Sequence, residues 1–357
     1  MSRQLKFGNK IIDDNSPMYV IAEIGNNHQG ELDKAKELFK AAKDAGADAV
    51  KLQKRDNTSL FTQAAYDAPY DNPNSFGDTY GSHREFLELG WPEFVELKDY
   101  AAELDILFFS TAFDIPSADF LEKLDMPAYK IASGDLRSLP LIKHVASFGK
   151  PYIVSTGGGT MDDVRRMHDE LMPINDQLCI MQCTAGYPPE WDQLNLRVIE
   201  TYREAFPDTV IGFSSHDSGI AMSIAGYMLG ARMIEKHFTL NRAMKGTDHS
   251  FSLEPQGLEK MVRDLQRLDI ALGDGQKATY DSEVAPVKKM SKSLFVARDI
   301  TAGNVLASDD ITMKSPGGGI PPYELDNLIG RTVNKDLEKD AFFDWDDIVT
   351  QAMQDVS

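Results

Sequence analysis

The stretch YVIAEIGNNHQGELDKAKELFKAAKDAGADAVKLQ (19–53) consists of a short apolar run, an amphipathic segment and a second short apolar run. In the middle segment the apolar residues recur near helical spacing, and Gly46 is a stop signal for a helix. Short apolar strands that alternate with helices are typical of a parallel sheet whose faces are covered by helices. The stretch therefore predicts a strand–helix–strand unit.

The same alternation continues along the chain to residue 280. Eight apolar runs of this kind occur, at YVIAEIG (19–25), ADAVKLQ (47–53), ILFFSTAF (106–113), AYKIAS (128–133), PYIVSTGG (151–158), LCIMQCT (178–184), TVIGFSS (209–215) and ARMIEKHF (231–238). Eight strand–helix units within ~260 residues predict a (β/α)₈ (TIM) barrel, which we place at residues 1–280. A doubly wound sheet is the alternative fold, but no GxGxxG motif follows the first run. Segment 54–105 is too long for a plain connection, so we expect it to cross the barrel mouth.

The pattern changes after Gly273. The residues that follow, GDGQKATYDSEVAPVKK, are polar and show no periodicity, which predicts a linker; we place it at 281–290. Short runs broken by Gly and Pro occupy residues 291–357. They predict a small, β-rich second domain.

Charge and cysteine usage restrict the partners and the compartment. Lys and Arg number 37 against 56 Asp and Glu, for a net charge of −19, which argues against nucleic acid or an anionic membrane as a partner. No apolar run approaches the ~20 residues of a membrane span, and the first residues lack the apolar core of a signal peptide. Cys179 and Cys183 fall in one expected strand, where their Cα atoms would lie ~13 Å apart, too far for a disulfide. We expect a cytoplasmic protein.

The chemistry of such a barrel is found at the carboxyl ends of its strands. Each expected strand carries polar side chains near its end, among them Glu23, Lys51, Gln53, Thr111, Lys130, Ser133, Asp135, Ser155, Tyr187, Ser214, His216, Glu235, Lys236 and His237. Taken singly, a Ser or Thr at a strand end is more often a helix cap. Lys51 and Lys130 differ, because each interrupts a buried apolar run, where an unpaired ammonium group is costly unless an anion meets it.

Two sites follow from this set. Two lysines and four hydroxyl groups are able to surround a small anion that carries both a phosphate and a carboxylate: Lys51, Lys130, Thr111, Ser133, Ser155 and Ser214. His216 and His237 end consecutive strands, so their imidazoles can share one metal ion. Two histidines leave positions for water and substrate oxygen, which suits a divalent ion of the Mn²⁺ type better than structural zinc.

Nine motifs in the chain resemble those of one enzyme family. They are AEIGNNHQG, KLQKR, FFSTAFD, YKIASGD, VSTGG, CTAGYPP, GFSSHDSG, EKHFTL and KGTDHSFSLEP, in that order. Together they resemble the sialic-acid synthase family, which includes the N-acetylneuraminate, legionaminate and pseudaminate synthases. The C-terminal PGGGIPP and DNLIGRTV resemble the antifreeze-like (SAF) domain of these enzymes, which has a β-clip fold. The resemblance runs through nearly the whole chain.

The resemblance implies a metal-dependent condensation of phosphoenolpyruvate with an N-acetylated hexosamine, which releases phosphate and forms a nine-carbon 2-keto acid. It implies Mn²⁺, or Mg²⁺ or another divalent ion, at His216 and His237, and Glu23 as the catalytic carboxylate. The implied phosphoenolpyruvate ligands are Lys51, Thr111, Lys130, Ser133, Ser155 and Ser214. The implied sugar contacts are Gln53, Asp135, Tyr187 and Asp248. It also implies a homodimer in which the small domain of one subunit covers the barrel of the other.

Two residues depart from the pattern of the bacterial N-acetylneuraminate members. Ser315 stands where those members often carry an arginine that reaches the partner's sugar, and Asp135 replaces a glutamate of the sugar site. Asp135 and the loop TYGSHREFLELG resemble the animal-type branch instead, some members of which use 6-phosphorylated sugars. The identity of the acceptor sugar is therefore open at this stage.

Two other functions compete with this reading. A Schiff-base aldolase is possible in principle, since Lys51, Lys130 or Lys236 at a strand end is a potential nucleophile. The second is a non-enzymatic protein, in which the small domain binds ice or glycans and the barrel is inert. An inert barrel is expected to lack some of the polar strand-end residues, and in this chain every one of them is present.

Overall fold

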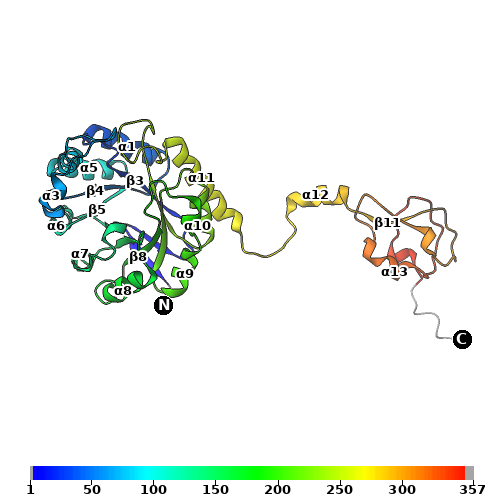
Figure 1. Cartoon of the computed structure of the whole chain (residues 1–357). Coiled ribbons are helices and arrows are strands. Elements are labelled where there is room, and N and C mark those ends of the chain that lie inside the picture. The colour runs from blue at the N-terminus through cyan, green and yellow to red at the C-terminus, as the bar shows by residue number, and fades with distance from the viewer. Residues whose placement is uncertain (1–2, 350–357) are drawn as a thin grey trace. The chain divides into compact units, whose positions relative to one another are not determined.

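The computed structural model of the chain describes residues 3–349 (Figure 1). The chain divides into two compact units, with the division between Gly273 and Asp274. In the described residues, every helix is too short or too polar to cross a membrane.

The first unit is a closed barrel of eight parallel strands surrounded by helices, which confirms the predicted TIM barrel (Figure 1). Around the barrel the order is β10-β3-β4-β5-β6-β7-β8-β9, so consecutive strands are neighbours and β10 closes on β3. The strands are β3 (Tyr19–Gly25), β4 (Ala49–Lys54), β5 (Leu107–Ala112), β6 (Tyr129–Ile131), β7 (Tyr152–Ser155), β8 (Leu178–Cys183), β9 (Val210–Ser215) and β10 (Met233–His237). Seven of the eight predicted runs contain one of these strands, and β4 extends one residue beyond its run (47–53), to Lys54.

Helices cover the outside of the barrel between successive strands. They are α1 (Leu32–Asp44), α5 (Trp91–Glu103), α6 (Ile115–Lys123), α7 (Leu139–Ala146), α8 (Met161–Leu171), α9 (Val198–Ala205), α10 (Ala221–Met228) and α11 (Pro255–Leu272). In α1 the buried residues Ala35, Leu38, Phe39 and Ala42 recur at spacings of three and four, which places them on one face against the strands. Gly46, at φ 87°, allows the chain to turn directly after this helix.

Side chains of the strands alternate between two cores. Val20, Ala22 and Ile24 of β3 point outward into the large cluster between strands and helices, whereas Tyr19 and Ile21 belong to the cluster inside the barrel. Only the amino-terminal part of the barrel interior is apolar. Further along the strands the inward positions become polar, which leaves the carboxyl end open for a site.

An N-terminal hairpin closes the amino end of the barrel. Its strands, β1 (Gln4–Phe7) and β2 (Lys10–Asp13), pair in antiparallel fashion. The ring of Phe7 makes edge contacts with Tyr19 and Phe109 at centroid distances of 5.3 Å, and the buried side chain lies in the interior cluster. The sequence pattern does not predict this hairpin, because its strands have only four residues each, too few for alternation to stand out.

Segment 54–105 contains three short helices before α5: α2 (Asn57–Leu60), α3 (Gln63–Tyr66) and α4 (Tyr80–Leu87). The Thr79 side chain caps α4 by accepting from Ser82, and His83 is buried against Tyr70 and Phe76. The short 3₁₀ helices η1 (Ser133–Asp135) and η2 (Trp191–Gln193) follow β6 and β8. These connections add to the rim at the carboxyl ends of the strands.

The second unit is small and rich in short β-structure. β11 (Ser293–Val296) pairs in antiparallel fashion with β12 (Ile311–Lys314), and isolated bridges join further segments. Its helices are α12 (Asp281–Met290), η3 (Ser308–Asp310), η4 (Pro322–Glu324), α13 (Leu325–Leu328) and η5 (Trp345–Asp347). Its own apolar cluster includes Leu294, Val296, Leu328 and Phe343. Ser315 is exposed, and its hydroxyl donates to the carbonyl of Met290 at 3.1 Å.

The segment predicted as a linker, 281–290, is helix α12 in the structure. The backbone amide of Tyr280 donates to the Glu283 carboxylate at 2.9 Å, which caps the first turn. Asp281 lies in the first turn and two lysines lie in the last, so the charges complement the helix dipole. Local capping thus forms a helix where hydrophobic periodicity gives no signal.

We predict that a chain ending after residue 280 folds by itself. The apolar clusters of the barrel and of the second unit share no residue, so truncation removes no part of the barrel's core. Circular dichroism and thermal unfolding measure this, with native helix content and one cooperative transition expected. An aggregated product, or one without a cooperative transition, would contradict it.

Candidate active site

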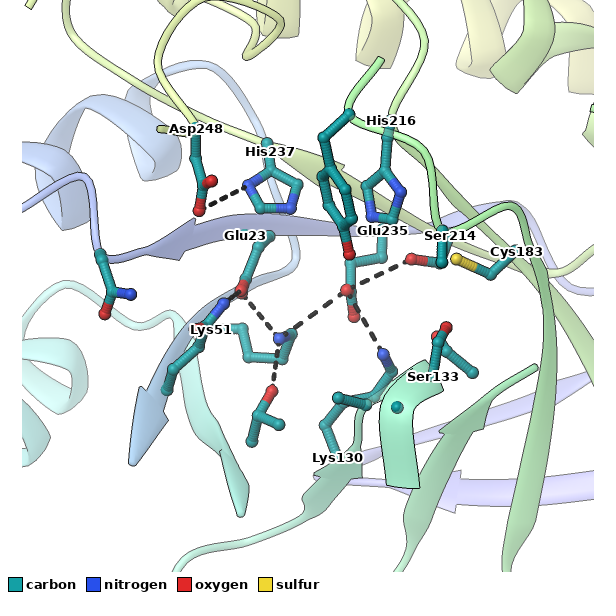
Figure 2. Close-up of a pocket in the computed structure, with 18 of the residues that line it drawn as sticks. Glu23, Lys51, Lys130, Ser133, Cys183, Ser214, His216, Glu235, His237 and Asp248 are labelled. Carbon is teal, nitrogen blue, oxygen red and sulfur yellow. Dashed lines mark hydrogen bonds and ion pairs between the residues drawn. The ribbon is translucent and has the colours of Figure 1, made fainter. Parts of the chain in front are cut away.

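The barrel opens at the carboxyl ends of its strands into a pocket of about 560 Å³. All eight strands contribute to its lining, and most of the side chains they supply are polar or charged. Figure 2 shows these side chains converging on one space. The strands supply Glu23, Lys51, Gln53, Thr111, Lys130, Ser155, Cys183, Ser214, Glu235 and His237.

Two lysines and two glutamates form one buried ion network in the pocket (Figure 2). Lys51 Nζ lies 2.8 Å from Glu23 Oε2 and donates to Thr111 Oγ1 at 2.7 Å. Glu235 Oε1 lies 3.4 Å from Lys130 Nζ and 3.7 Å from Lys51 Nζ. The side chains of Glu23 and Lys51 are each only 2% exposed. These charges are buried away from water, and burying any one of them without its partners would be costly.

The surroundings shift the two carboxyl groups in opposite directions. Burial raises the pKa of Glu23 above its usual range, and Glu235 adds to this rise while Lys51 opposes it. Burial also disfavours the charged form of Glu235, but Lys130 and Lys51 hold its pKa below the usual value. Glu235 is therefore the permanent counter-ion, and Glu23 is the carboxyl group that is more easily protonated.

Hydroxyl and thiol groups form one side of the pocket. Ser133 Oγ accepts from a backbone amide of the loop after β7 at 3.0 Å, and Ser214 Oγ donates to Glu235 Oε1 at 3.4 Å. The Cys183 thiol lies against both serines. Ser155 Oγ is buried and has no hydrogen-bond partner among residues 3–349. A buried hydroxyl without a partner is costly, which leaves Ser155 ready to donate to a bound anion.

His216 and His237 lie side by side, with ring centroids 5.3 Å apart (Figure 2). Burial lowers the pKa of both imidazoles, that of His216 to about 3, so both rings are neutral at physiological pH. His216 Nδ1 lies 2.9 Å from the carbonyl oxygen of Thr184, which places the hydrogen on Nδ1 and leaves Nε2 with a free lone pair. His237 Nδ1 makes no hydrogen bond in the described part of the chain.

This pair fits a divalent metal ion with open coordination positions. Neutral imidazole nitrogen is a good ligand for first-row divalent metals. Asp248 Oδ2 lies 3.9 Å from His237 Nδ1 and is the acidic group facing that ring (Figure 2). Within residues 3–349, no group of three or more His, Cys, Asp or Glu side chains is arranged to hold a metal.

Three of the four residues expected to contact the sugar line the pocket. Gln53 Nε2 donates to Glu23 Oε1 at 2.7 Å, and the Tyr187 ring stacks on His216 at a centroid distance of 4.1 Å. Asp248 is the third. Asp135 lies in η1 and does not line the pocket; burial raises its pKa to about 6, and the nearby Arg55 opposes the rise.

The structure adds three charged residues that sequence analysis did not assign to a ligand. Glu235 ends a strand, as noted, but its role as the counter-ion of both lysines depends on the barrel's closure. Arg55 follows β4 and Arg84 lies in α4, and both line the pocket. Arg84 lies in the loop TYGSHREFLELG, which resembles the animal-type branch, but no local pattern marks this one residue as part of the pocket.

Lys236 does not face the pocket. It alternates with Glu235 and His237 along β10, so its side chain lies on the outer surface of the barrel, where it pairs with Asp217 at 2.7 Å. This corrects the suggestion that Lys236 is a potential Schiff-base nucleophile. Lys51 and Lys130 do face the pocket, and each forms an ion pair with a glutamate, Lys51 with Glu23 and Lys130 with Glu235.

Comparison with known proteins identifies the family of this chain. Residues 38–277 match the model of the NeuB family, and residues 291–349 match that of the SAF domain. The chain belongs to the NeuB family. N-acetylneuraminate-9-phosphate synthase of Homo sapiens is 39% identical over 325 residues, which cover 91% of this chain and 90% of that protein. N,N'-diacetyllegionaminic acid synthase of Legionella pneumophila is 33% identical over 336 residues, or 92% and 94% of the two chains.

A solved structure shows the same architecture as this NeuB-family chain. The N-acetylneuraminic acid synthetase of Leptospira borgpetersenii, crystallised with citrate, aligns with a TM-score of 0.70 at 30% identity. The alignment covers 80% of this chain and 96% of that structure. The chain is thus an enzyme of a family of synthases that condense phosphoenolpyruvate with an amino sugar.

We predict that Glu235→Gln lowers the free energy of unfolding at neutral pH by about 3 kcal/mol, because it leaves two buried ammonium groups with one carboxylate. Urea denaturation of the ligand-free protein measures this. The control is Glu170→Gln, which removes an ion pair to Lys143 whose side chains are both more than 40% exposed, and should cost less than about 1 kcal/mol. Equal losses in the two variants would contradict the prediction.

Proposed function

We propose that this NeuB-family enzyme condenses phosphoenolpyruvate with a phosphorylated N-acetylated hexosamine, N-acetylmannosamine 6-phosphate, to form a nine-carbon 2-keto sugar acid phosphate. The observation that carries the reaction is the pocket itself. Two lysines, a set of hydroxyl groups, a carboxyl group of raised pKa and two neutral histidines all face one cavity of about 560 Å³. Each group matches a separate requirement of the condensation.

The lysines and hydroxyl groups bind phosphoenolpyruvate. Lys51 and Lys130 supply two positive charges inside the pocket, and Ser155 supplies an unused hydroxyl. Charge-assisted hydrogen bonds from such groups to phosphate and carboxylate oxygens are the strong ones. The same contacts stabilise the phosphate as it leaves, so the lysines act both in binding and in the later step.

His216 and His237 are the proposed ligands of a divalent metal, Mn²⁺ or Mg²⁺. A divalent ion held there supplies Lewis-acid polarisation of the sugar aldehyde. The support is the fit described above: both imidazoles are neutral, and the Thr184 carbonyl fixes His216 with its Nε2 free. Tyr187 covers the His216 ring and limits the access of bulk water to it.

Glu23 is the proposed base. In the condensation, the C2=C3 double-bond electrons of phosphoenolpyruvate form the bond from C3 to the aldehyde carbon, the C=O π electrons move onto the aldehyde oxygen, and C2 becomes electron-deficient. Water adds to C2, and one of its protons passes to the Glu23 carboxylate and from there to the sugar alkoxide. The bond from C2 to the phosphate oxygen then breaks, and the remaining hydroxyl proton leaves with the phosphate as C2 becomes the keto carbon. Gln53 holds Glu23 Oε1 and Lys51 holds Glu23 Oε2, so the base is oriented before the substrate arrives.

The proposal of a phosphorylated acceptor rests on a second cationic cluster at the mouth. Arg55 stacks on Phe113 at 3.8 Å, and its Nη1 is buried without a hydrogen-bond partner in the described residues. Burial, followed by the positive charge of Arg84, lowers the pKa of Arg55 to about 10, so the two guanidinium groups repel each other. The nearest counter-charge is Glu88, whose Oε1 lies 3.8 Å from Arg55 Nη1.

A phosphate dianion between two guanidinium groups removes this repulsion and supplies acceptors for both. Within residues 3–349, the Arg84 guanidinium donates to the Tyr80 hydroxyl, at 3.0 Å from Nη2, and its remaining hydrogens have no acceptor there, so they are free to bind a ligand. The name of the human relative, a 9-phosphate synthase, is in line with this charge arrangement. Because another relative is named as a legionaminic acid synthase, unphosphorylated sugars should be tested together with the phosphorylated one.

The assembly and the compartment are proposals as well. We propose a homodimer with an exchanged small domain, which rests on the family resemblance, and a cytoplasmic location. The location is supported by the two cysteines, Cys179 and Cys183, which are both free thiols buried in the barrel.

The test of the proposed reaction is release of inorganic phosphate from phosphoenolpyruvate with a panel of sugars. The panel contains N-acetylmannosamine, its 6-phosphate and 2,4-diacetamido trideoxyhexoses. We expect release with the 6-phosphate, and loss of release in EDTA. No release with any sugar would overturn the proposal, and irreversible inactivation by borohydride with pyruvate would favour the Schiff-base aldolase instead.

We predict that Lys51→Met and Lys130→Met each raise the KM for phosphoenolpyruvate by about 10- to 100-fold, since each removes a charge-assisted hydrogen bond. Steady-state kinetics measure this at saturating sugar. Lys10→Met, which removes an exposed lysine of the N-terminal hairpin, is the matched control and should leave the KM unchanged. An unchanged KM in the pocket variants would show that these lysines are structural.

Arg84→Met is predicted to raise the KM for N-acetylmannosamine 6-phosphate at least about tenfold while leaving the KM for phosphoenolpyruvate within a factor of about two. The reason is that Arg84 reaches the mouth and not the lysine network. Arg263→Met, on the outer surface of α11, serves as the control. If the KM values for phosphorylated and unphosphorylated acceptors change equally, the phosphate assignment is wrong.

The metal ligands can be tested in the absence of substrate. His216→Ala and His237→Ala should each abolish Mn²⁺ binding, read from the electron paramagnetic resonance signal of free Mn²⁺, because each removes one of two protein ligands. The circular dichroism spectrum should remain that of the wild type, since an open catalytic site contributes little to folding. Full metal content in either variant would refute the assignment.

A further inference from the structure

A buried ion pair lies directly behind the two histidines, on the outer side of the barrel. Lys236 Nζ lies 2.7 Å from Asp217 Oδ1, 3.2 Å from Ser215 Oγ, and also donates to the backbone carbonyl of Asp217. The Ser215 hydroxyl donates to the same Asp217 carboxylate. The side chains of Lys236 and Asp217 are 1% and 2% exposed. The three hydrogens of the ammonium group thus have three oxygen acceptors, and no part of the assembly faces the substrate pocket.

The position of this pair in the chain is what gives it a role. Asp217 directly follows His216, and Lys236 directly precedes His237. The ladder between β9 and β10 pairs Lys236 with Ser215, which is the last residue of β9. Beyond Ser215 the strand ladder no longer fixes the chain. The bonds from Lys236 to the carboxylate and carbonyl of Asp217 therefore extend the connection between the two strands past His216.

Stability alone does not account for this pair. Burying two charges costs several kcal/mol of desolvation per ion, and well-packed apolar residues in place of a buried pair are often neutral or stabilising. A hydrogen-bonded ion pair is directional, because its bonds join particular donor and acceptor atoms, whereas contact between apolar side chains is not. Here those atoms belong to the two residues next to the proposed metal ligands.

We infer that Lys236 and Asp217 are positioning residues that fix the separation of His216 and His237 for one shared divalent cation. The inference rests on the proposed metal site. The Thr184 carbonyl orients the His216 ring within the pocket, and the ion pair holds its backbone from behind. The imidazole pair is thus supported on two sides before any ligand binds, which is how metal sites maintain ligand geometry.

The test compares metal affinity with stability in the full-length protein. Lys236→Met should weaken Mn²⁺ binding by about 10- to 100-fold, the usual effect of removing the support of a metal ligand, measured by electron paramagnetic resonance without substrates. It should also destabilise the fold, because it leaves Asp217 buried without its partner. The double variant Lys236→Met with Asp217→Leu removes both charges. It should recover most of the stability in urea denaturation but retain the weak Mn²⁺ binding.

Lys150→Met is the control. Lys150 forms ion pairs with Glu122 and Asp125, and none of these three residues adjoins either histidine in the sequence. It should leave Mn²⁺ affinity at the wild-type value. Wild-type affinity in the double variant would overturn the inference and show that the pair is only structural. If Lys236→Met alone fails to fold, the double variant decides the question.

Failure of the inference is distinguishable from failure of the proposed reaction. If the wild type binds Mn²⁺ and His216→Ala does not, the metal site stands, and wild-type affinity in the double variant overturns only the positioning role. A wild type that binds no Mn²⁺ overturns the metal site and this inference together. A wild type that binds Mn²⁺ but releases no phosphate from phosphoenolpyruvate overturns the reaction alone.

Discussion

The two-residue period of β-strands in a closed barrel is the constraint on which the site depends. Every second side chain must point inward, and the in-register pairing of parallel strands brings inward positions of neighbouring strands to similar heights. Glu23 pairs in register with both Lys51 and His237, and Thr111 pairs with Lys130. Charged side chains from several strands therefore meet at the carboxyl end of the interior, although they are far apart in sequence. Closure of the barrel is what makes these residues neighbours.

Along each strand, the inward positions near the amino end contribute to stability, and those near the carboxyl end form the site. The lower inward positions, such as Ile21 and Phe109, are apolar and fill the interior together with the N-terminal hairpin. The level above holds ammonium and carboxylate groups that water no longer solvates. This level contributes little net stability, because desolvation offsets the attraction between its charges. It holds polar groups ready for an anion instead, and the apolar level beneath provides the rigid support for that arrangement.

Much of the fold and part of the site could be predicted from the sequence, for identifiable reasons. The barrel strands are local apolar runs, so their period is visible without the structure, and the strand-end position of Lys51 or His237 follows directly. The hairpin is not predicted because its two strands have only four residues each, and α12 is not predicted because capping of its first turn, rather than apolar periodicity, marks it. The loop that contains Arg84 is recognisable in the sequence, but only the path of segment 54–105 shows that Arg84 reaches the pocket. Position near a strand end does not by itself tell which face of the strand a side chain lies on. Lys236 neighbours Glu235 and His237 in sequence but lies on the opposite face of β10. Asp135 follows β6 in the short helix η1 and does not line the pocket, and its role as a sugar contact stays a prediction.

The hairpin β1–β2 has one more consequence. Because Phe7 and its neighbours fill the amino end of the barrel, the pocket opens toward the carboxyl ends of the strands. Both substrates of the proposed reaction therefore enter, and both products leave, through the same end of the barrel.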